Sequence, residues 1–342
     1  MAVGPLSNRN RIANRDNAVK HPLLFVAVFV VLESGVIRAQ GATGQGTDPA
    51  GMTRVEFSKR FVPKAVGDTI VVQTLPEETL VMSGGPYILQ GKGLYIGAGH
   101  VEINGRVEIR SFDPKKPADP AEGTGDKGPE FTSPPDHLCA NNNGCNGSKG
   151  HDGGKGDDKK ATAGASARVV TLDLDSLTGG GTLVITADGQ QGGQGQKGGK
   201  GGTGQQAGRG GDRHCGDLSG AGKDSPGDGA IPGPSGNGGI GGRGGSGGTG
   251  GSVLLSRTLQ QARAAGRILV SINGGTGGLG GDSGDWGEIG AGNEGGSGAT
   301  CGGGGTGTKT FPSKPAYDAN QFRGPVGPSG AKGTVDFFDS TP

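Results

Sequence analysis

Apolar and polar residues alternate along residues 67–112 in the manner of short β-strands. Apolar side chains occupy every second position within each run, and Gly, Pro or Asn separates one run from the next. A period of two with this punctuation predicts strands that each have one buried face. The apolar members of these predicted strands are Ile70, Val72, Leu80, Met82, Ile88, Leu94, Ile96, Val101, Ile103, Val107 and Ile109.

Beyond residue 112, three Gly-rich excursions interrupt the alternation, and Gly recurs in them at every third position. Short apolar stretches between and after the excursions predict further strands, and residues 253–265 predict a short helix that ends at Gly266. The excursions span 113–165, 188–251 and 273–332, and the strands are predicted at 168–174, 182–186, 268–272 and 335–338.

Two stretches of the chain match each other without a gap at a spacing of 85 residues. The match has little identity but a consistent apolar pattern, which indicates an internal repeat in which each strand leads into a Gly-rich excursion. Regular return to a strand argues against a simple flexible linker. The matched pairs are Val169 with Leu254, Val170 with Leu255, Leu174 with Leu259, Leu177 with Ala262, Gly181 with Gly266, Leu183 with Ile268, and Ile185 with Val270.

Gly at every third position suits the three-residue turn of polyproline II, because all the Gly positions then lie on one edge. The interpretation that we favour is an intrachain bundle of antiparallel polyproline II segments. The alternatives are disorder and a collagen triple helix, and the scarcity of Pro in most triplets disfavours the triple helix. We therefore predict a fold that is mainly β plus irregular, with a small β-layer, a sandwich or a solenoid, beside a polyproline II bundle.

The beginning of the chain has the order of a secretory signal: basic residues, an apolar run at 23–32 and the small-residue site Ile37-Arg38-Ala39. Ten apolar residues are fewer than the roughly 20 that span a bilayer, which disfavours the alternative of a membrane anchor. We predict a signal peptide at 1–39, a flexible leader at 40–66, and no membrane span after cleavage. The basic residues before the apolar run are Arg9, Arg11, Arg15 and Lys20.

Composition restricts the class of protein. The 342 residues include 79 Gly and 20 Pro but only 10 Phe, 3 Tyr and 1 Trp, too few aromatic side chains for one core across the whole length. A large α/β enzyme is therefore not expected. The formal net charge is +1, so no bulk field attracts nucleic acid or an anionic membrane.

Export makes Cys139, Cys145, Cys215 and Cys301 candidates for disulfides. The short polar loop between Cys139 and Cys145 can bring its ends to bonding distance, which leaves Cys215 and Cys301 as a long-range pair. Four cysteines allow three pairings, and this is the one that we favour.

A metal site is the competing interpretation of the first cysteine pair. His137, Cys139, Cys145 and His151 lie close together in the sequence as His-x-Cys-x5-Cys-x5-His. Zinc fingers use tighter Cys spacing, and an oxidising compartment works against thiolate ligands, so disulfides are favoured over metal.

The remaining search for chemistry gives few candidates. None of the five histidines lies in a nucleophile elbow, a His-Glu-x-x-His motif or a phosphate loop, so no catalytic or cofactor-binding residue is predicted. Residues 153–158 and 277–282 match the calcium-binding pattern Gly-Gly-x-Gly-x-Asp and make Asp158 and Asp282 candidate ligands. Such matches are expected by chance in a Gly-rich chain, and they lack the tandem repetition that stacks calcium sites.

Trp286 is the single Trp and lies beside Asp285 in a Gly-rich stretch. It is a candidate platform for stacking a glycan, although a lone aromatic in such a stretch more often caps a small cluster. Asn146-Gly-Ser148 is a formal acceptor for N-glycosylation, meaningful only in a eukaryotic source.

The Gly-Gly-x run 237–251 and the runs 189–204 and 275–290 resemble the polyproline II bundles of snow-flea-type antifreeze proteins and of Gly-rich bacteriophage tail-fibre adhesins. They also resemble collagen-like secreted bacterial proteins. The resemblance covers about half of the chain and implies ice binding in the first case and receptor binding at exposed loops in the second. Charged residues at predicted outward positions depart from a flat ice-binding face: Lys197, Lys200, Arg209, Arg243, Asp282 and Glu288.

These features together predict a secreted, non-catalytic structural or adhesive protein of a cell surface or matrix. Its expected partners are further copies of itself or a polymer of an envelope or host surface. The alternative is a module that binds a glycan, calcium or ice, and an enzyme built on a β-helix ranks third.

Overall fold

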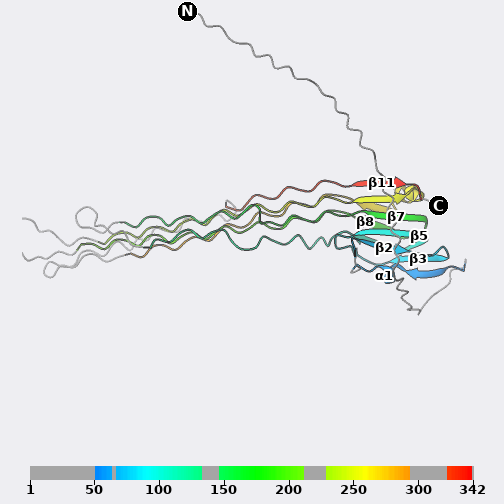
Figure 1. The fold of residues 1–342 in the computed structure, drawn as a ribbon, viewed down its shortest axis with the longest axis horizontal. Helices are drawn as coiled ribbons and strands as arrows, with labels where there is room; N and C mark the ends of the chain where they lie inside the picture. Colours follow the sequence, from blue (N-terminus) through cyan, green and yellow to red (C-terminus); the bar gives the residue numbers. More distant parts are fainter. Residues whose placement is uncertain (1–50, 64–66, 133–145, 212–228, 293–321, 341–342) are drawn as a thin grey trace, which may run out of the picture. The chain divides into compact units, whose positions relative to one another are not determined.

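The computed structural model describes residues 51–63, 67–132, 146–211, 229–292 and 322–340, which all belong to one compact unit, Gln45–Pro342. Figure 1 shows strands gathered at one end of this unit and long Gly-rich segments that run alongside one another away from them. Among the described residues, no helix is long and apolar enough to cross a membrane.

The strands form two sheets, and every pair of neighbouring strands is parallel. The seven-stranded sheet has the order β1-β3-β5-β7-β9-β11, with β2 also paired to β5, and the four-stranded sheet has the order β10-β8-β6-β4. The strands are β1 (Thr53–Glu56), β2 (Thr69–Gln73), β3 (Glu78–Ser83), β4 (Tyr87–Ile88), β5 (Gly93–Asn104), β6 (Arg106–Arg110), β7 (Val170–Thr178), β8 (Thr182–Thr186), β9 (Ser252–Ser256), β10 (Ile268–Ser271) and β11 (Thr334–Phe338). The short helical elements are α1 (Phe57–Arg60), η2 (Arg257–Leu259) and α2 (Gln260–Ala264).

Alternating apolar residues of both sheets form one hydrophobic core. On β6, Val107 and Ile109 are fully buried, and Leu183 and Ile185 occupy the matching positions on the paired strand β8. Burying a side chain of this size is worth about 1.5–3 kcal/mol, so these alternating rows hold the sheets together.

Short turns carry the chain from β5 to β6 and from β7 to β8, that is, from one sheet to the other, whereas η2 and α2 lie between β9 and β10. Gly105 separates β5 from β6 with φ +71, and Gly179 follows β7 with φ +76, a backbone conformation that favours Gly. A Gly-rich excursion then returns the chain to the first sheet, where β7 pairs with β5 and β9 pairs with β7. Because each cycle enters the sheet in the same direction, neighbouring strands are parallel.

The predicted fold class, mainly β plus irregular with a small β-layer beside a polyproline II bundle, was wrong. The strands form a parallel, α/β-like arrangement of seven-stranded and four-stranded sheets with few helical residues. The described residues of the Gly-rich segments carry almost no regular secondary structure beyond isolated positions. Alternation of apolar residues identifies the buried face of a strand but not the direction of its neighbours, and the prediction missed the direction.

Six Gly-rich segments are hydrogen-bonded to one another, and we call them the glycine array. Segments that leave the sheets pair in parallel with one another, as do segments that return, while a leaving and a returning segment pair antiparallel. Examples are Gly198 N to Asp282 O at 2.9 Å for the first kind of pair and Gly239 N to Gly199 O at 2.8 Å for the antiparallel kind. The leaving segments are 113–132, 187–211 and 272–292, and the returning segments are 146–167, 229–251 and 322–333.

Close approach of backbones explains why Gly recurs in the array. A Cβ placed on Gly199 would overlap the carbonyl oxygen of Asp126, and one placed on Gly239 would overlap that of Gly154. No side chain fits between segments that approach this closely, so the array is packed from backbone atoms and not from apolar side chains.

Candidate functional site

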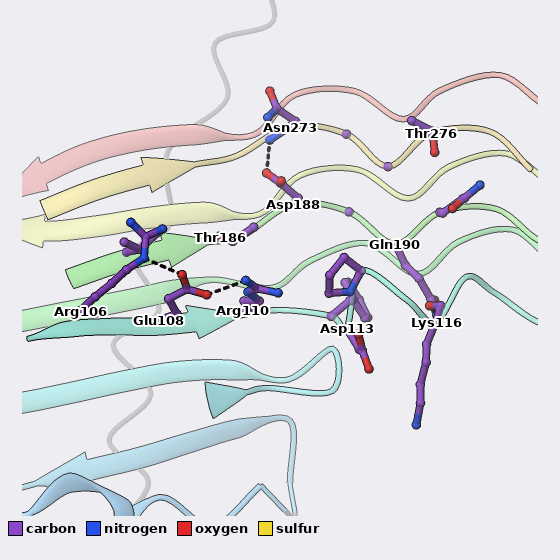
Figure 2. Close-up of a pocket in the computed structure, with 17 residues that line it drawn as sticks. Arg106, Glu108, Arg110, Asp113, Lys116, Thr186, Asp188, Gln190, Asn273 and Thr276 are labelled. Atoms are coloured by element: carbon purple, nitrogen blue, oxygen red, sulfur yellow. Dashed lines mark hydrogen bonds and ion pairs between the residues drawn. The ribbon is translucent and has the colours of Figure 1, made fainter. Parts of the chain in front are cut away.

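A groove of about 550 Å³ lies where the four-stranded sheet passes into the glycine array, and we call it the junction groove (Figure 2). Its lining comes from three stretches that lie side by side: Arg106 to Lys116, Val184 to Gln191, and Asn273 to Thr276. The first stretch leaves β6, the second leaves β8 and the third follows β10. Consecutive cycles of the chain thus each contribute one strip of the same surface.

The middle strip forms the floor of the junction groove because β8 pairs with β6 on one side and β10 on the other. Val184 and Thr186 are outward-facing on β8 and partly exposed, and Gly189 has no side chain. Larger polar side chains of the flanking strips rise on both sides of this part of the floor, and Asp188, Gln190 and Gln191 continue the middle strip.

One wall carries a row of alternating charge on β6. The Nε of Arg106 donates to Oε1 of Glu108 at 2.7 Å, and Nη2 of Arg110 donates to Oε2 at 2.5 Å (Figure 2). Hydrogen bonds from Arg106 and then Arg110 lower the pKa of Glu108. The carboxylate therefore stays ionised and holds both guanidinium groups along the wall.

The opposite wall is ordered by Asp188. Its Oδ1 accepts hydrogen bonds from the hydroxyl of Ser271 and from the backbone N–H of Asn273, both at 2.7 Å. These bonds tie the strip after β8 to the strip after β10, and they fix the position of the Asn273 side chain beside the groove.

Gln190 fixes the far part of the floor. Its amide nitrogen donates to the carbonyl oxygen of Lys116 at 3.2 Å, and its amide oxygen accepts from the N–H of Ala165 at 3.1 Å. One side chain thus connects its own leaving segment, 187–211, with the leaving segment 113–132 and the returning segment 146–167.

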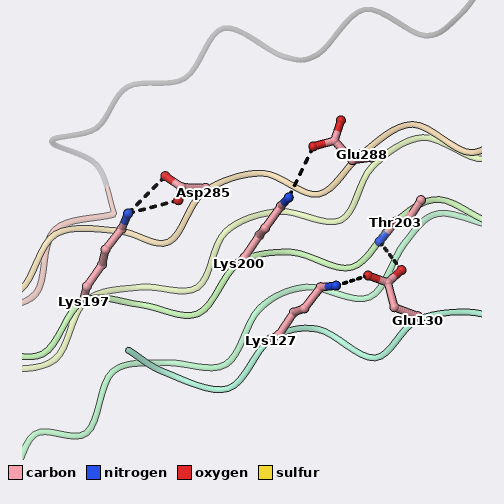
Figure 3. Close-up of polar contacts among 7 residues, drawn as sticks. All are labelled: Lys127, Glu130, Lys197, Lys200, Thr203, Asp285 and Glu288. Atoms are coloured by element: carbon pink, nitrogen blue, oxygen red, sulfur yellow. Dashed lines mark hydrogen bonds and ion pairs between the residues drawn. The ribbon is translucent and has the colours of Figure 1, made fainter. Parts of the chain in front are cut away.

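Beyond the groove, the leaving segments carry a second set of ordered polar contacts (Figure 3). Lys197 pairs with Asp285 at 3.1 Å, and Lys200 pairs with Glu288 at 3.3 Å, so the same offset of 88 residues recurs one triplet later. These pairs are exposed, and each contributes little to stability. They show that side chains at every third residue form aligned rows.

Glu130 lies in the same set of contacts and has the most strongly shifted pKa of the described residues. A hydrogen bond from Lys127 and hydrogen bonds from Thr203, whose N–H lies 2.9 Å from Oε2, lower the pKa of Glu130 to about 2. Glu130 therefore connects two leaving segments as a carboxylate.

The candidate calcium ligands do not lie in an acidic cluster. Asp158 accepts hydrogen bonds from Lys155 Nζ at 2.6 Å and from the N–H of Arg243 at 2.7 Å, and these bonds lower its pKa. Asp282 pairs with Arg323 at 2.8 Å. Within the described ranges, no group of three or more His, Cys, Asp or Glu residues is placed to hold a metal ion.

The other residues singled out from the sequence are not brought together. The ring of His151 stacks on Phe131 at 5.1 Å between centroids, and Trp286 is partly buried on the third leaving segment. His137 and the four cysteines, Cys139, Cys145, Cys215 and Cys301, lie outside the described residues, so their predicted pairing and the metal alternative stay predictions.

Comparison of the chain with protein-family models, with curated proteins and with solved structures finds no match. The residues of the junction groove were not identified from the sequence. The run Arg106-Val-Glu-Ile-Arg110 was a usable signal, because its alternation places three charged side chains on the solvent face of one strand.

Proposed function

We propose that this chain is a secreted, non-catalytic structural or adhesive protein of a cell surface or matrix. The proposal rests on the glycine array, in which six segments are joined by backbone hydrogen bonds at intervals of three residues. A backbone so closely packed leaves no room for side chains between the segments. The chain thus devotes much of its length to a scaffold in which most non-Gly side chains are at least partly exposed, with Gln196, Ser235 and Ser283 among the buried exceptions.

Outward apolar side chains support a role in contact with a partner surface. Ile240 is 46% exposed and Val326 is 60% exposed, and both lie on returning segments; Leu279, on a leaving segment, is 51% exposed. The free energy falls when a partner covers apolar groups on an ordered surface, so such groups favour binding. The partner that we infer is a second copy of this chain or a polymer of an envelope or host surface.

The first test uses the full-length chain, produced in a secreting host and purified from the medium. Sedimentation velocity over a range of concentrations measures self-association, and surfaces coated with peptidoglycan or mucin measure adhesion. We expect association in at least one of these assays. A chain that stays monomeric at every concentration and is retained on neither surface would overturn the proposal.

Two variants separate the array from its outward side chains. Gly239→Ala places a Cβ against the carbonyl of Gly154 and is expected to abolish association, whereas Gly180→Ala adds a Cβ in open space and should leave it unchanged. Ile240→Ser keeps the array glycines and is expected to weaken association, with Val71→Ser, an exposed position on β2, as its control.

A ligand-binding module is the second candidate, and the junction groove is the observation that favours it. Its volume of about 550 Å³ lies within the range of small-molecule sites, and polar side chains surround it. A defined soluble ligand with no self-association and no adhesion would favour this function over the structural one.

A further inference from the structure

The geometry points to a ligand for the junction groove: a neutral, hydroxyl-rich glycan chain that lies along β8 and the leaving segment that follows it. This inference rests on the proposed adhesive function and names the chemical class of polymer that the protein would hold. Three features of the groove carry it: its extended floor, its mixture of hydrogen-bonding groups and its balanced charge.

The floor has the shape of an extended site. It continues from Val184 to Gln191, and a chain of this length in extended conformation covers roughly 20 Å at about 3.3 Å per residue. Val184, Thr186 and Gly189 keep their part of the floor low. Arg106 and Arg110 rise on one wall and Asn273 on the other (Figure 2). Such a groove suits a linear polymer better than a compact small molecule.

The walls offer both donors and acceptors to hydroxyl groups. The side chain of Arg106 is 63% exposed, and its bond to Glu108 uses Nε, so its two terminal nitrogens face outward as donors. The hydroxyls of Thr186 and Thr276 and the amide of Gln191 can each donate and accept. A sugar hydroxyl also donates and accepts, so this mixture is complementary to a glycan.

The charges in the junction groove cancel. Three cations, Arg106, Arg110 and Lys116, line it together with three carboxylates, Glu108, Asp113 and Asp188. Without a net field, the groove has no long-range attraction for a polyanion, because repulsion by its three carboxylates offsets attraction by its three cations. A neutral glycan needs no such field, because it binds through hydrogen bonds and apolar contacts.

Apolar side chains in the groove match the apolar face of a sugar ring. Phe112 and Pro114 line the groove beside the charged wall, next to the polar floor. A sugar ring has an apolar face of C–H groups and an edge of hydroxyls, so it can place the face on Phe112 and the edge on the Thr and Gln side chains.

The test is isothermal titration calorimetry on the full-length purified chain. The ligands used are hexasaccharides of β-1,4-linked glucose, of β-1,4-linked N-acetylglucosamine and of α-1,4-linked glucose, with polygalacturonate as the acidic comparison. We expect at least one neutral hexasaccharide to bind with an affinity that changes less than about twofold when salt is raised, because screening acts on net charge.

Variants locate the binding. Thr186→Trp fills the groove floor and should weaken the affinity for that hexasaccharide at least tenfold, and Arg106→Met should weaken it severalfold by removing outward donors. Val71→Trp, on an exposed position of β2 outside the groove, should not change it. Thermal melts followed by circular dichroism check that each variant folds.

Three results would overturn the inference: no binding of any neutral hexasaccharide by the folded chain, binding that Thr186→Trp leaves unchanged, or binding of polygalacturonate alone that falls steeply with salt. If one of these three results is obtained while the chain still self-associates or adheres, the glycan groove fails and the proposed structural or adhesive function stands. Hexasaccharide binding by a chain that neither self-associates nor adheres would leave the groove standing while the proposed structural or adhesive function fails.

Discussion

The backbone N–H of Gly199 donates to the carbonyl oxygen of Gly154 at 2.8 Å, although the two residues lie on segments that run in opposite directions. The carbonyl oxygen of Gly199 in turn accepts the N–H of Gly239 at 2.8 Å. The same residue also approaches Asp126 so closely that a Cβ would overlap its carbonyl oxygen. One Gly thus contacts three other segments, and the array depends on the missing side chain.

Substitution of Gly199 by Ala should therefore destabilise the fold. The added Cβ meets backbone atoms that belong to a hydrogen-bonded neighbour and cannot turn away as a side chain can. Overpacking of this kind typically costs about 1–3 kcal/mol, and we expect the free energy of unfolding to fall by at least that amount. Urea unfolding followed by circular dichroism measures the change.

Gly180→Ala is the matched control, because a Cβ on Gly180 has no atom within 4 Å. Its free energy of unfolding should stay within about 0.5 kcal/mol of the original. Equal effects of the two substitutions would contradict the close packing of the array.

Glu130 gives a prediction about pH. Its folded-state pKa of about 2 lies below the ordinary value, so its contribution to stability is present above the ordinary pKa and is lost as pH falls toward about 2. Because a hydrogen bond from Lys127 is the largest cause, Lys127→Met should raise this pKa toward its ordinary range. A titration of the Glu130 side chain followed by NMR measures both values, and an unchanged pKa in the variant would assign the shift elsewhere.

A substitution in the hydrophobic core should lower the free energy of unfolding by an amount that is usual for a buried Leu. Leu172 is fully buried on β7, where it pairs with Leu255 of β9 and Ile96 of β5. Leu172→Ala should lower the free energy of unfolding by about 2–5 kcal/mol, because it removes apolar contact and leaves a cavity. Thr171→Ala, at the neighbouring position on the opposite face, should cost much less. A comparable loss in both would mean that β7 does not present alternate faces to core and solvent.

The sequence repeat predicts the register between β8 and β10 correctly, but not the register between β7 and β9. Spacing by 85 residues matches Leu183 with Ile268, and these residues are Cα partners in the structure. The same spacing matches Val170 with Leu255, but Val170 pairs with Val253. From Val253 to Ile268 the chain is two residues longer than from Val170 to Leu183, in the stretch that holds η2 and α2, so a gapless alignment cannot satisfy both sheets.

Neither the direction of the strands nor the junction groove could be predicted from the sequence, because both depend on where distant segments of the chain meet. Whether neighbouring strands run parallel depends on where each excursion returns, which no local pattern encodes. The groove unites Arg110, Thr186 and Asn273, residues 76 and 87 positions apart that only the parallel pairing brings side by side. The sequence pattern predicts the solvent face of residues 106–110, but it does not predict which other segments lie beside that face.

The predicted signal peptide is tested by the mass of the secreted chain. Export with cleavage after Ala39 should give a product that begins at Gln40 and lacks residues 1–39. Intact mass spectrometry of protein purified from the medium, followed by N-terminal sequencing, measures this. Substitution of Leu23 to Leu32 by a polar sequence should abolish export, and a full-length chain retained with the cells would contradict the prediction.

Reductant and calcium should have different effects on thermal stability. The predicted pairing of Cys215 with Cys301 closes a long loop, and loss of such a disulfide typically costs about 2–4 kcal/mol, so reductant should lower the melting temperature.

Calcium or a chelator should leave the melting temperature unchanged, because Asp158 is already bonded to Lys155 and Asp282 to Arg323. Melts of the full-length chain with each additive, followed by circular dichroism, measure both effects. A rise in melting temperature with calcium that Asp158→Asn removes would restore a calcium site, because a bound cation stabilises the folded state by mass action.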